Sequence, residues 1–495
     1  MTGDCRNFGE LLLAAGARFG AREAFVVGAE RLSYAAWAGS ARSLAALLLE
    51  RGVRRGQPVA ILLPSSADYA IAAAAVLMIG AIATGIDPRL GPRELRAILA
   101  KAAPALVITP DEQELPDTGG PIPSLRRSEL AAAYRRTDGL VDAAAVARDA
   151  PACIVWTSGT TGEPKGAWYD HANLAAAVDT AGVMVAAHDR CLLPLPFAHA
   201  GYMAKQWQQV AFGVTYVLTP VPWSAREMLR LMVAERITAA FGVPTQWAKL
   251  LELPELATAD RSSLRFCGIS TAPAPPELIA ALTRALGCPM IVRYAMTESP
   301  SITGTRFEDP PEVLFRTVGR PQQGIELQIT ADDGAPVVAG APGRIRVRGP
   351  VVMRGYWNDP LATARALTPD GWLITDDIGR LDEQGNLILL GRASDRYIRG
   401  GYNVHPLEVE RVLEEHPGVA RAAVVGRTTP VIGEIGVAFI VPSDPAAQPA
   451  EAELRQWCRE RLADYKTPDE FRYVTQLPLT PMLKVDRRTL RVWLA

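Results

Sequence analysis

Helical and strand patterns alternate along most of the chain. The segment Ser33 to Gly52 has apolar residues at helical spacing and Ser33 as N-cap, and the apolar run Val59 to Pro64 that follows is typical of a buried strand. The same pairing recurs at Leu95 to Pro110 and Leu229 to Pro244, without a fixed period. Alternation of this kind predicts an α/β fold, with parallel sheets covered by helices.

The pattern changes near Glu326, where short strands follow one another closely. This change predicts a β-rich subdomain that closes a large N-terminal domain of layered α/β subdomains. Beyond it, a helix at Pro406 to Glu415, two strands and a helix at Glu451 to Tyr465 predict a small, mobile α+β C-terminal domain. We expect an N-terminal domain at 1–391, a hinge at 392–395 and a C-terminal domain at 396–495.

One segment, Tyr69 to Ile86, is apolar for 18 residues, which is the lower limit for a membrane span. Its many alanines, Gly80 and Gly85 favour instead a buried helix that runs into a strand. The N-terminal apolar run has charged residues around it, which favours an amphipathic helix over a signal peptide. We therefore expect a cytoplasmic protein without a membrane span.

Composition supports an ordinary globular protein of several domains. The chain has 495 residues, 49% of them hydrophobic and 21% charged, and its length corresponds to about two to four domains. Lys and Arg number 52 against 53 Asp and Glu, and the basic residues are dispersed, so we expect no nucleic-acid partner. The six cysteines form no C-x-x-C pair, which argues for reduced thiols and against a zinc site.

The stretch Thr157 to Ala167, "TSGTTGEPKGA", follows the apolar run Ala152 to Trp156. Glycines without Cβ atoms, hydroxyls and one lysine after a strand are typical of a loop that binds an anion. A Walker A loop requires G-x-x-x-x-G-K-[ST], whereas Lys165 stands three residues after Gly162 and is followed by glycine. The spacing therefore excludes a P-loop NTPase.

These eleven residues closely resemble the phosphate loop of the AMP-forming adenylating superfamily, which includes acyl- and aryl-CoA ligases, peptide synthetase adenylation domains and firefly luciferases. Four further segments resemble that family's motifs in the family's order. They are "YAMTES" at Tyr294 to Ser299, "GWLITDDIGRLDEQG" at Gly371 to Gly385, "GRASDRYIRGGYNVHPLEVE" at Gly391 to Glu410 and "LPLTPMLKVDRRTL" at Leu477 to Leu490. Five motifs in order make a chance match implausible.

The resemblance implies that a carboxylate attacks the α-phosphorus of ATP to give acyl-AMP and pyrophosphate, after which a thiol attacks the anhydride. It implies ATP, Mg²⁺ and coenzyme A as cofactors and a small carboxylic acid as substrate. The residues implied as catalytic are Lys484, Glu298, Thr157 and His199. Those implied in nucleotide and CoA binding are Thr157, Ser158, Gly159, Thr160, Thr161, Gly162, Lys165, Thr271, Ala272, Pro273, Tyr294, Ala295, Met296, Thr297, Asp377, Arg392, Gly400, Gly401 and Lys484.

The resemblance also assigns roles. Lys484 would bridge the substrate carboxylate and the α-phosphate as a cation on a flexible stem. Glu298 would hold Mg²⁺, because a hard cation prefers carboxylate oxygen. Tyr294 would lie against adenine, while Asp377 and Arg392 would bind the ribose.

His199 occupies the place of the gate beside the acyl channel in this family, and we assign it no proton transfer. Amino-acid-activating relatives carry an Asp after the phenylalanine that corresponds to Phe197. This chain has Ala198 there, which favours a plain carboxylic acid.

Several positions depart from the family pattern. Ser270, Thr271 and Ala295 replace glycines that border the acyl slot, so the pocket should be narrowed or redirected. Asp376 replaces a glycine beside Asp377, Ser394 replaces the usual hinge Asp or Lys, and Leu483 precedes the lysine where glycine is common. Gly400 and Gly401, which resemble the glycines of the pantetheine tunnel, are retained.

Three functions remain open on the sequence. The leading one is an acyl-CoA synthetase. The second is an enzyme that adenylates an acid and passes it to a carrier protein or a partner thiolating enzyme. The third, a non-catalytic nucleotide-binding relative, is disfavoured because Glu298, Asp377, Arg392 and Lys484 are all present. Luciferase-type oxygenation shares these motifs, and the sequence leaves the acid and the oligomeric state open.

Overall fold

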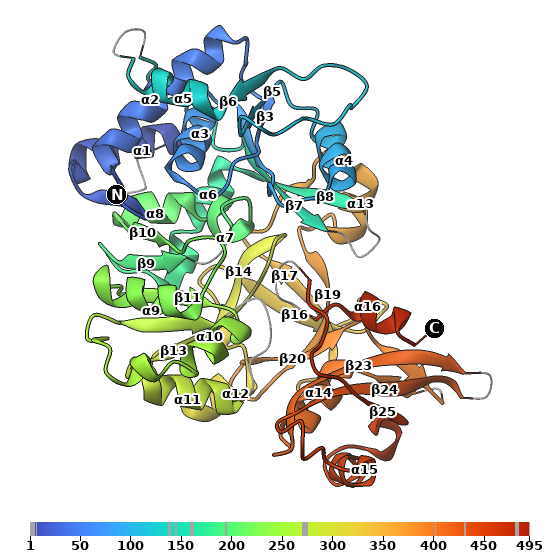
Figure 1. Cartoon of the computed structure of the whole chain (residues 1–495). Coiled ribbons are helices and arrows are strands. Elements are labelled where there is room, and N and C mark those ends of the chain that lie inside the picture. Colours follow the sequence, from blue (N-terminus) through green and yellow to red (C-terminus); the bar gives the residue numbers. More distant parts are fainter. Residues whose placement is uncertain are drawn as a thin grey trace.

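Two large, mostly parallel sheets form the N-terminal part of the protein (Figure 1). The computed structural model describes residues 5, 7–136, 140–143, 146–158, 163–193, 196–269, 276–400, 402–429, 432–480 and 485–494. Within this part of the chain the strands form four sheets. The predicted α/β architecture is thereby confirmed.

The first large sheet has the strand order β18-β8-β7-β4-β3-β5-β6. Neighbouring strands from β6 to β7 in this order are parallel, while β8 and β18 add an antiparallel edge. The strands are β3 (Pro58–Ile61), β4 (Ile82–Gly85), β5 (Leu106–Thr109), β6 (Ser124–Arg126), β7 (Pro151–Ser158), β8 (Pro164–Asp170) and β18 (Gly355–Tyr356).

The second large sheet has the order β15-β14-β13-β12-β11-β9-β10-β1-β2 and is parallel from β13 to β1. Its strands are β1 (Glu23–Val27), β2 (Glu30–Ser33), β9 (Arg190–Leu193), β10 (Thr215–Leu218), β11 (Ala239–Gly242), β12 (Phe266–Ile269), β13 (Met290–Met296), β14 (Ser299–Gly304) and β15 (Arg320–Pro321).

Helices cover both sheets and fill the space between them. They are α1 (Phe8–Phe19), α2 (Tyr34–Glu50), α3 (Ala67–Met78), α4 (Pro92–Ala102), α5 (Arg127–Tyr134), α6 (His171–Ala176), η1 (Asp179–Met184), α7 (Ala200–Met203), α8 (Gln206–Phe212), α9 (Ala225–Ala234), α10 (Pro244–Leu251), η2 (Pro254–Ala257), α11 (Pro276–Leu286), α12 (Pro311–Arg316) and α13 (Pro360–Ala366).

Helix α3 is buried on nearly every side. The Ser66 hydroxyl accepts a hydrogen bond from the Tyr69 backbone N–H at 3.3 Å and so caps the helix, and the Trp37 indole donates to the Ala70 carbonyl at 3.0 Å. The chain then enters β4, as the apolar run predicts. No helix in the described ranges is long and apolar enough to cross a membrane.

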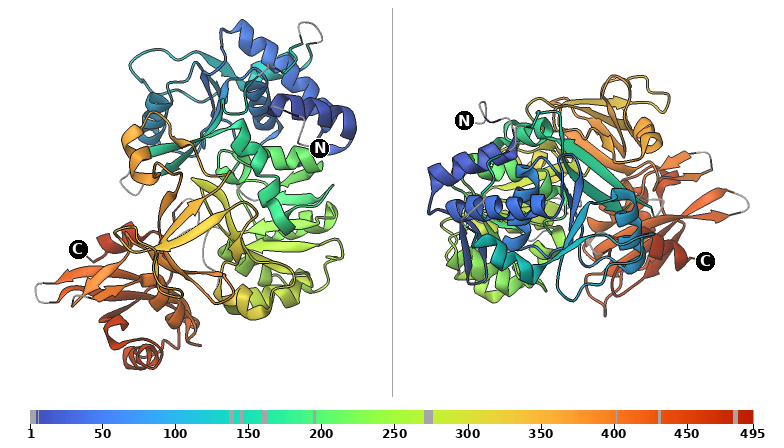
Figure 2. Two further views of the ribbon diagram at one scale, coloured as in Figure 1. Left: turned by 180° about the vertical axis from the view of Figure 1, so that it is seen from behind. Right: turned by 90° about the horizontal axis from the view of Figure 1, so that it is seen from above.

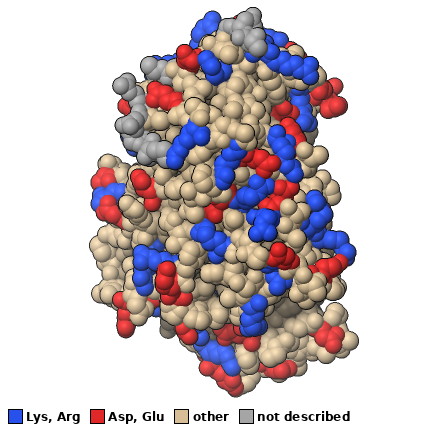
Figure 3. Space-filling model, turned by 90° about the vertical axis from the view of Figure 1, so that its left-hand side faces the viewer, with Lys and Arg blue, Asp and Glu red and all other residues tan. Residues whose placement is uncertain are grey.

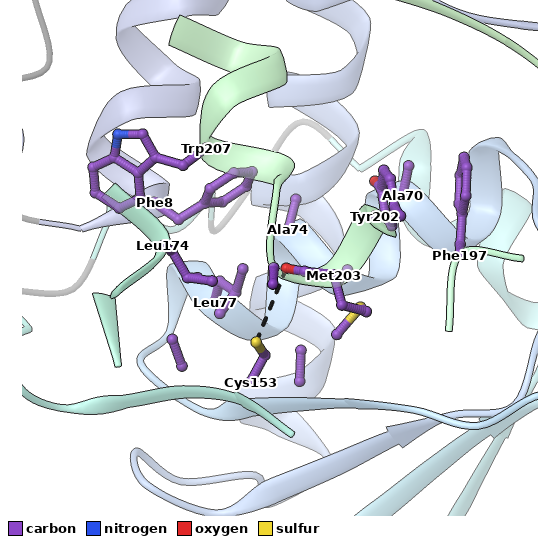
Figure 4. Packing of buried hydrophobic residues seen from close by; sticks show 14 of the residues in the cluster. Phe8, Ala70, Ala74, Leu77, Cys153, Leu174, Phe197, Tyr202, Met203 and Trp207 are labelled. Atoms are coloured by element: carbon purple, nitrogen blue, oxygen red, sulfur yellow. Dashed lines mark hydrogen bonds between the residues drawn. The ribbon is translucent and has the colours of Figure 1, made fainter. Parts of the chain in front are cut away.

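The core between the two sheets joins α1, α3 and α8 to β7 (Figure 4). Phe197 stacks on Tyr202 with ring centroids 3.8 Å apart, and the Cys153 thiol donates to the Met203 carbonyl at 3.9 Å. Packing of this density fixes the segment that carries α7 and α8 against β7.

The remaining sheets are smaller. The third has the order β16-β17-β19-β20 and forms the predicted β-rich subdomain. Its strands are β16 (Glu326–Thr330), β17 (Gly343–Arg348), β19 (Leu373–Leu381) and β20 (Leu387–Arg392). The fourth belongs to the smaller C-terminal domain, which lies at one end of the molecule in all views (Figures 1 and 2). It contains β21 (Tyr397–Arg399), β22 (Tyr402–Val404), β23 (Val419–Thr429), β24 (Gly433–Pro442) and β25 (Glu470–Tyr473), with α14 (Pro406–Glu414), α15 (Glu451–Arg459), η3 (Asp464–Lys466) and α16 (Arg487–Val492).

Two sequence predictions need correction in length. The helix expected at Glu451 to Tyr465 ends at Arg459, after which the Leu462 N–H still bonds the Cys458 carbonyl at 2.8 Å before the chain turns into η3. The Lys466 side chain then pairs with Glu408 at 2.7 Å, which holds this turn against α14. The strands β23 and β24 form a longer hairpin than the apolar runs suggested.

On the face that Figure 3 shows, charge of both signs is dispersed, as the sequence predicted. Lys and Arg side chains alternate with Asp and Glu side chains on the face shown in Figure 3. The cysteines carry free thiols, but the fold brings Cys267 and Cys288 together, with their sulfur atoms 3.7 Å apart.

Candidate active site

The predicted phosphate loop joins β7 to β8. These strands are antiparallel, with Thr157 opposite Lys165, and the Thr157 hydroxyl donates to the Lys165 carbonyl at 3.4 Å. A Cβ on Gly166 would lie 2.6 Å from a methyl of Ile154, so the close packing of this hairpin requires glycine. Gly159, Thr160, Thr161 and Gly162 lie outside the described residues, as does the side chain of Ser158.

Tyr356 connects this loop to Glu298. It lies on β18, beside β8, and its hydroxyl donates to Glu298 Oε1 at 2.8 Å. The Lys165 ammonium lies 5.4 Å from the centre of the Tyr356 ring. Burial, and after it the charge of Glu298, raises the pKa of Tyr356, so the phenol keeps its proton and remains a donor.

Thr297 and Glu298 form the tight turn between β13 and β14, where Met296 pairs with Ser299. The Met353 N–H donates to the Glu298 carbonyl at 2.9 Å, and the Tyr169 hydroxyl donates to the Thr297 carbonyl. The turn is thereby fixed against β8, so the Glu298 carboxylate is held close to the phosphate loop.

Tyr294, Asp377 and Arg392 form one row of contacts. The Tyr294 hydroxyl donates to Asp377 Oδ2 at 2.5 Å, and Arg392 Nε lies 3.4 Å from Asp377 Oδ1. Asp377 and Arg392 are direct cross-strand partners on β19 and β20. Burial of Tyr294, together with the Asp377 charge, raises the pKa of the phenol, so it stays a donor.

Ala295 lies in the irregular step of β13 between Tyr294 and Met296, and it is exposed although its strand lies inside a sheet. Bulges of this kind often stand beside active sites, because they redirect the strand and open its surface. After the buried Tyr294, the strand therefore becomes accessible to solvent at Ala295, Met296 and Thr297. Thr271, Ala272 and Pro273, expected across from them, lie outside the described residues.

His199 lies in a separate set of contacts. It precedes α7, and its Nε2 is 3.7 Å from Asp87 Oδ2, which Arg89 also contacts at 2.7 Å. Burial opposes ionisation of Asp87, but the nearby His199 ring and the hydrogen bonds from Arg89 outweigh it and hold the pKa of the carboxyl below its usual range. Within the described residues, no hydrogen bond or ion pair joins His199 to Tyr294 or Glu298.

Two departures from the family pattern contact each other. The Ser394 hydroxyl donates to Asp376 Oδ2 at 2.5 Å, and the Ala393 N–H donates to the Asp376 carbonyl at 2.7 Å. Arg344 lies 3.8 Å from the same carboxylate. The segment after β20 is thereby tied to β19, next to Asp377.

A magnesium ion would find a single carboxylate at this site. Within the described ranges, no group of three or more His, Cys, Asp or Glu residues is placed to hold a metal. Glu298, which shares its Oε1 with Tyr356, fits a hard cation that takes its other ligands from phosphates and water.

The expected CoA and lysine positions are only partly described. Gly400 is exposed at the turn between β21 and β22 with φ of +56°, a conformation that favours glycine. Gly401 and Lys484 lie outside the described residues.

Sequence reasoning missed Tyr356 and Tyr169. Neither stands within the five motifs, and a tyrosine next to a strand pattern is most often a packing residue. Only the pairing of β18 with β8, two segments far apart in the chain, brings Tyr356 to Glu298.

Comparison with known proteins identifies the same class of protein as the sequence motifs. A family model described as AMP-binding enzyme matches residues 12–357, and one described as AMP-binding enzyme C-terminal domain matches residues 408–484. A sulfoacetate–CoA ligase from Cupriavidus necator is 33% identical over 92% of this chain and 91% of its own. A feruloyl-CoA synthase from an Amycolatopsis species is 33% identical over 94% of both chains. The ATP-bound crystal structure of MatB from Rhodopseudomonas palustris, 27% identical, superposes with a TM-score of 0.90 over 98% of this chain and 99% of that one.

The fold and the site thus define an adenylate-forming enzyme. The chain belongs to the AMP-binding enzyme family, which is the AMP-forming adenylating superfamily that its motifs predicted. It is an acid–thiol ligase of the AMP-forming kind.

Proposed function

We propose that the protein joins a small carboxylic acid to coenzyme A through an acyl-adenylate. One observation carries this proposal: the described contacts run without a break from the phosphate loop to the predicted ribose site. Lys165 contacts Tyr356, Tyr356 bonds Glu298 on the β13–β14 turn, and Tyr294 on β13 bonds Asp377. Segments from three sheets therefore meet where ATP would lie.

Each end of this row suits one part of ATP. Asp377, held by Tyr294 and Arg392, offers carboxylate oxygens that can accept from both ribose hydroxyls. Thr157 and Lys165 hold the ends of a loop whose N–H groups and hydroxyls would bind the β- and γ-phosphates. The α-phosphorus of ATP would then lie between the ribose-binding residues and the phosphate loop.

Magnesium would be held by Glu298 together with phosphate oxygens. Bound there, it would offset the charge of the pyrophosphate leaving group. Tyr356 orients the Glu298 carboxylate through its hydrogen bond, and Lys165 adds a positive charge over the same ring.

We propose Lys484 as the cation that meets the substrate carboxylate and the α-phosphate, and residues 396–495 as the domain that carries it. Two negative reactants must approach each other, so a cation placed between them stabilises the in-line transition state. The end of β20 at Arg392 and the start of β21 at Tyr397 support a hinge at 392–395. Rotation of the C-terminal domain about this hinge would remove Lys484 from the site and bring in the turn at Gly400 and Gly401, where the pantetheine thiol would enter.

The family does not fix the acid. The two relatives compared above are named for sulfoacetate and for the feruloyl group, which differ widely in size and charge. Ala198, after Phe197, offers no carboxylate to an amino group, which supports a substrate without a free amine.

The test is a panel of carboxylic acids, each supplied with ATP and Mg²⁺, with and without CoA. We expect at least one acid to give pyrophosphate, AMP and an acyl-CoA of matching mass. The Lys484→Ala variant should still bind ATP but lose about 10²–10³ in the rate of pyrophosphate release. Acyl-AMP that accumulates and never reaches CoA would contradict the second half-reaction, and ADP as product would contradict the first.

A further inference from the structure

Two neighbouring residues after β20 are bound to different parts of the molecule. The Ser394 hydroxyl donates to Asp376 of β19 at 2.5 Å, so Ser394 is tied to the β-rich subdomain. In the next residue, Asp395 Oδ2 lies 3.2 Å from Arg487 Nε, and Oδ1 lies 3.4 Å from a terminal nitrogen of Arg491. Both arginines belong to α16 of the C-terminal domain. The side-chain contacts of the hinge therefore pass from one domain to the other between Ser394 and Asp395.

Arg487 is held firmly on its other sides. Its guanidinium donates to both carboxylate oxygens of the buried Glu410, at 2.6 and 2.8 Å, and to the Val424 carbonyl at 3.2 Å. Glu410 lies on α14 and also accepts from the Val424 N–H at 2.7 Å. Paired hydrogen bonds between a guanidinium and a carboxylate fix the orientation of both groups. Asp395 thus pairs with an arginine that α14 and β23 already hold in place.

Arg487 also stands close in sequence to the proposed catalytic lysine. Residues 485–487, which we call the lysine segment, directly follow Lys484. Within this segment Val485 forms a bridge with Leu479, and the Asp486 side chain caps the first turn of α16. The lysine segment is therefore ordered, and its last residue carries the contact with the hinge.

The two functional segments of the C-terminal domain depend on this contact to different degrees. The turn at Gly400 follows Asp395 directly along the chain, through β21, so the backbone itself carries this turn when the hinge rotates. Lys484 lies far along the chain, and the pairing of Asp395 with Arg487 joins its segment directly to the hinge. A catalytic group displaced by 1 Å can lose about 10²-fold in rate. Placement of Lys484 therefore depends on a contact that placement of the Gly400 turn does not need.

We propose that Asp395 is a positioning residue for adenylation, which transmits the rotation of the hinge to the lysine segment through Arg487. This inference rests on the proposed function, in which Lys484 meets the α-phosphate and the C-terminal domain rotates. Asp395 acts only through Arg487, and no bond to it forms or breaks in either half-reaction. Without its carboxylate the lysine segment would be held less precisely relative to the hinge, so adenylation would slow while thioester formation would continue.

The Asp395→Asn variant tests the residue in the two half-reactions separately. Adenylation is measured by exchange of labelled pyrophosphate into ATP in the presence of the acid, and thioester formation by acyl-CoA production from a supplied acyl-adenylate. We expect adenylation to slow by about 5- to 20-fold with KM for ATP unchanged, and thioester formation to slow by less than about 2-fold. Asp464→Asn, at an exposed aspartate of the same domain that pairs with Arg459, is the matched control and should change neither rate.

A double substitution shows whether Asp395 acts through Lys484. Lys484→Ala alone and Lys484→Ala combined with Asp395→Asn should adenylate at the same residual rate, because the effects of residues that act as one unit do not add. A residue that only stabilised the domain would add its own loss in the double variant. Amide hydrogen exchange gives a readout without turnover. We expect residues 485–492 to exchange several times faster in Asp395→Asn than in the wild-type protein, and β23 and β24 to stay unchanged.

The outcomes separate this inference from the proposed function. Equal loss of both half-reactions in Asp395→Asn, a further loss in the double variant, or unchanged exchange at residues 485–492 would overturn the coupling and leave the ligase proposal standing. Absence of acyl-AMP with every acid would contradict the proposed function, and hydrogen exchange would then decide whether Asp395 restrains the lysine segment. If Asp395→Asn fails to fold, Arg491→Gln, at an exposed arginine of the same contact, should slow adenylation more than thioester formation. Equal rates of loss in that variant would overturn the coupling.

Discussion

At the scale of single residues, Asp377 links the nucleotide site to its support. It accepts from Tyr294 at 2.5 Å and faces Arg392 at 3.4 Å, so its carboxylate is fixed before any ligand binds. A carboxylate held in this way can bind two ribose hydroxyls without further ordering, and preorganisation of this kind improves affinity.

We therefore expect Asp377→Asn to raise KM for ATP by about 10- to 100-fold, because an amide replaces a charged acceptor. KM for the acid should change little. Steady-state kinetics with ATP varied at saturating acid makes the measurement. Glu383→Gln, at an exposed carboxylate in the turn after β19, is the matched control and should leave KM for ATP unchanged. An equal effect of the two substitutions would remove Asp377 from the nucleotide site.

His171 gives a prediction about acid stability. It is fully buried at the start of α6, and neither ring nitrogen has a hydrogen-bond partner among the described residues. Burial, and after it the charge of Arg55, lowers the pKa of His171 to about 4. In the unfolded chain this histidine binds a proton near pH 6.5, whereas in the folded chain it does so only near pH 4. Its contribution to the free energy of unfolding is therefore fully present above pH 6.5 and is lost as the pH falls toward 4.

The wild-type protein should lose up to about 3 kcal/mol of unfolding free energy through this group between pH 7 and pH 4. His171→Phe should lose correspondingly less over the same interval, since phenylalanine does not titrate. Urea denaturation of both proteins at pH 7 and pH 5, followed by tryptophan fluorescence, measures the difference. Parallel pH dependence of the two proteins would show that His171 does not titrate on unfolding.

At the scale of elements, β19 and the segment after β20 act together. Asp376 on β19 binds Ser394 and lies near Arg344 of β17, so the proposed hinge is tied to the β-rich subdomain. Relatives tend to have glycine at the first position and Asp or Lys at the second. The sequence shows each departure separately, but only the structure shows that the two side chains contact each other.

Ser394→Ala removes the hydroxyl that donates to Asp376. We expect trypsin to cleave at Arg392 or Arg396 several times faster in this variant, because an exposed hydrogen bond to a carboxylate contributes on the order of 1 kcal/mol. The melting temperature should stay the same. Ser394→Thr keeps the hydroxyl and serves as the control. Cleavage of the alanine variant at the wild-type rate would mean that the contact does not restrain the hinge.

Element order was predictable because local rules act over short stretches. The Ser33 cap, the proline at the start of α14 and the change to closely spaced strands at Glu326 are local features, and the structure confirms the elements they mark. The end of α15 and the length of the β23–β24 hairpin were not predictable. Both depend on contacts with distant segments, such as Lys466 with Glu408.

At the scale of the whole molecule, the site forms where segments that are far apart in the chain meet. Glu298, Asp377 and Lys165 stand in motifs that the sequence displays, because their chemistry imposes a local pattern. Tyr356 belongs to no such pattern, since its role arises from the pairing of β18 with β8, two segments far apart in the chain. Sequence therefore predicts the nucleotide chemistry better than the acid.

The central claim is that the carboxylate attacks the α-phosphorus of ATP and that a thiol then displaces AMP. The most direct test supplies the best acid of the panel with both carboxylate oxygens labelled with oxygen-18, together with ATP, Mg²⁺ and CoA. We expect mass spectrometry to find one labelled oxygen in AMP, one in the acyl-CoA thioester and none in pyrophosphate. Unlabelled AMP, or label in inorganic phosphate beside ADP, would contradict it.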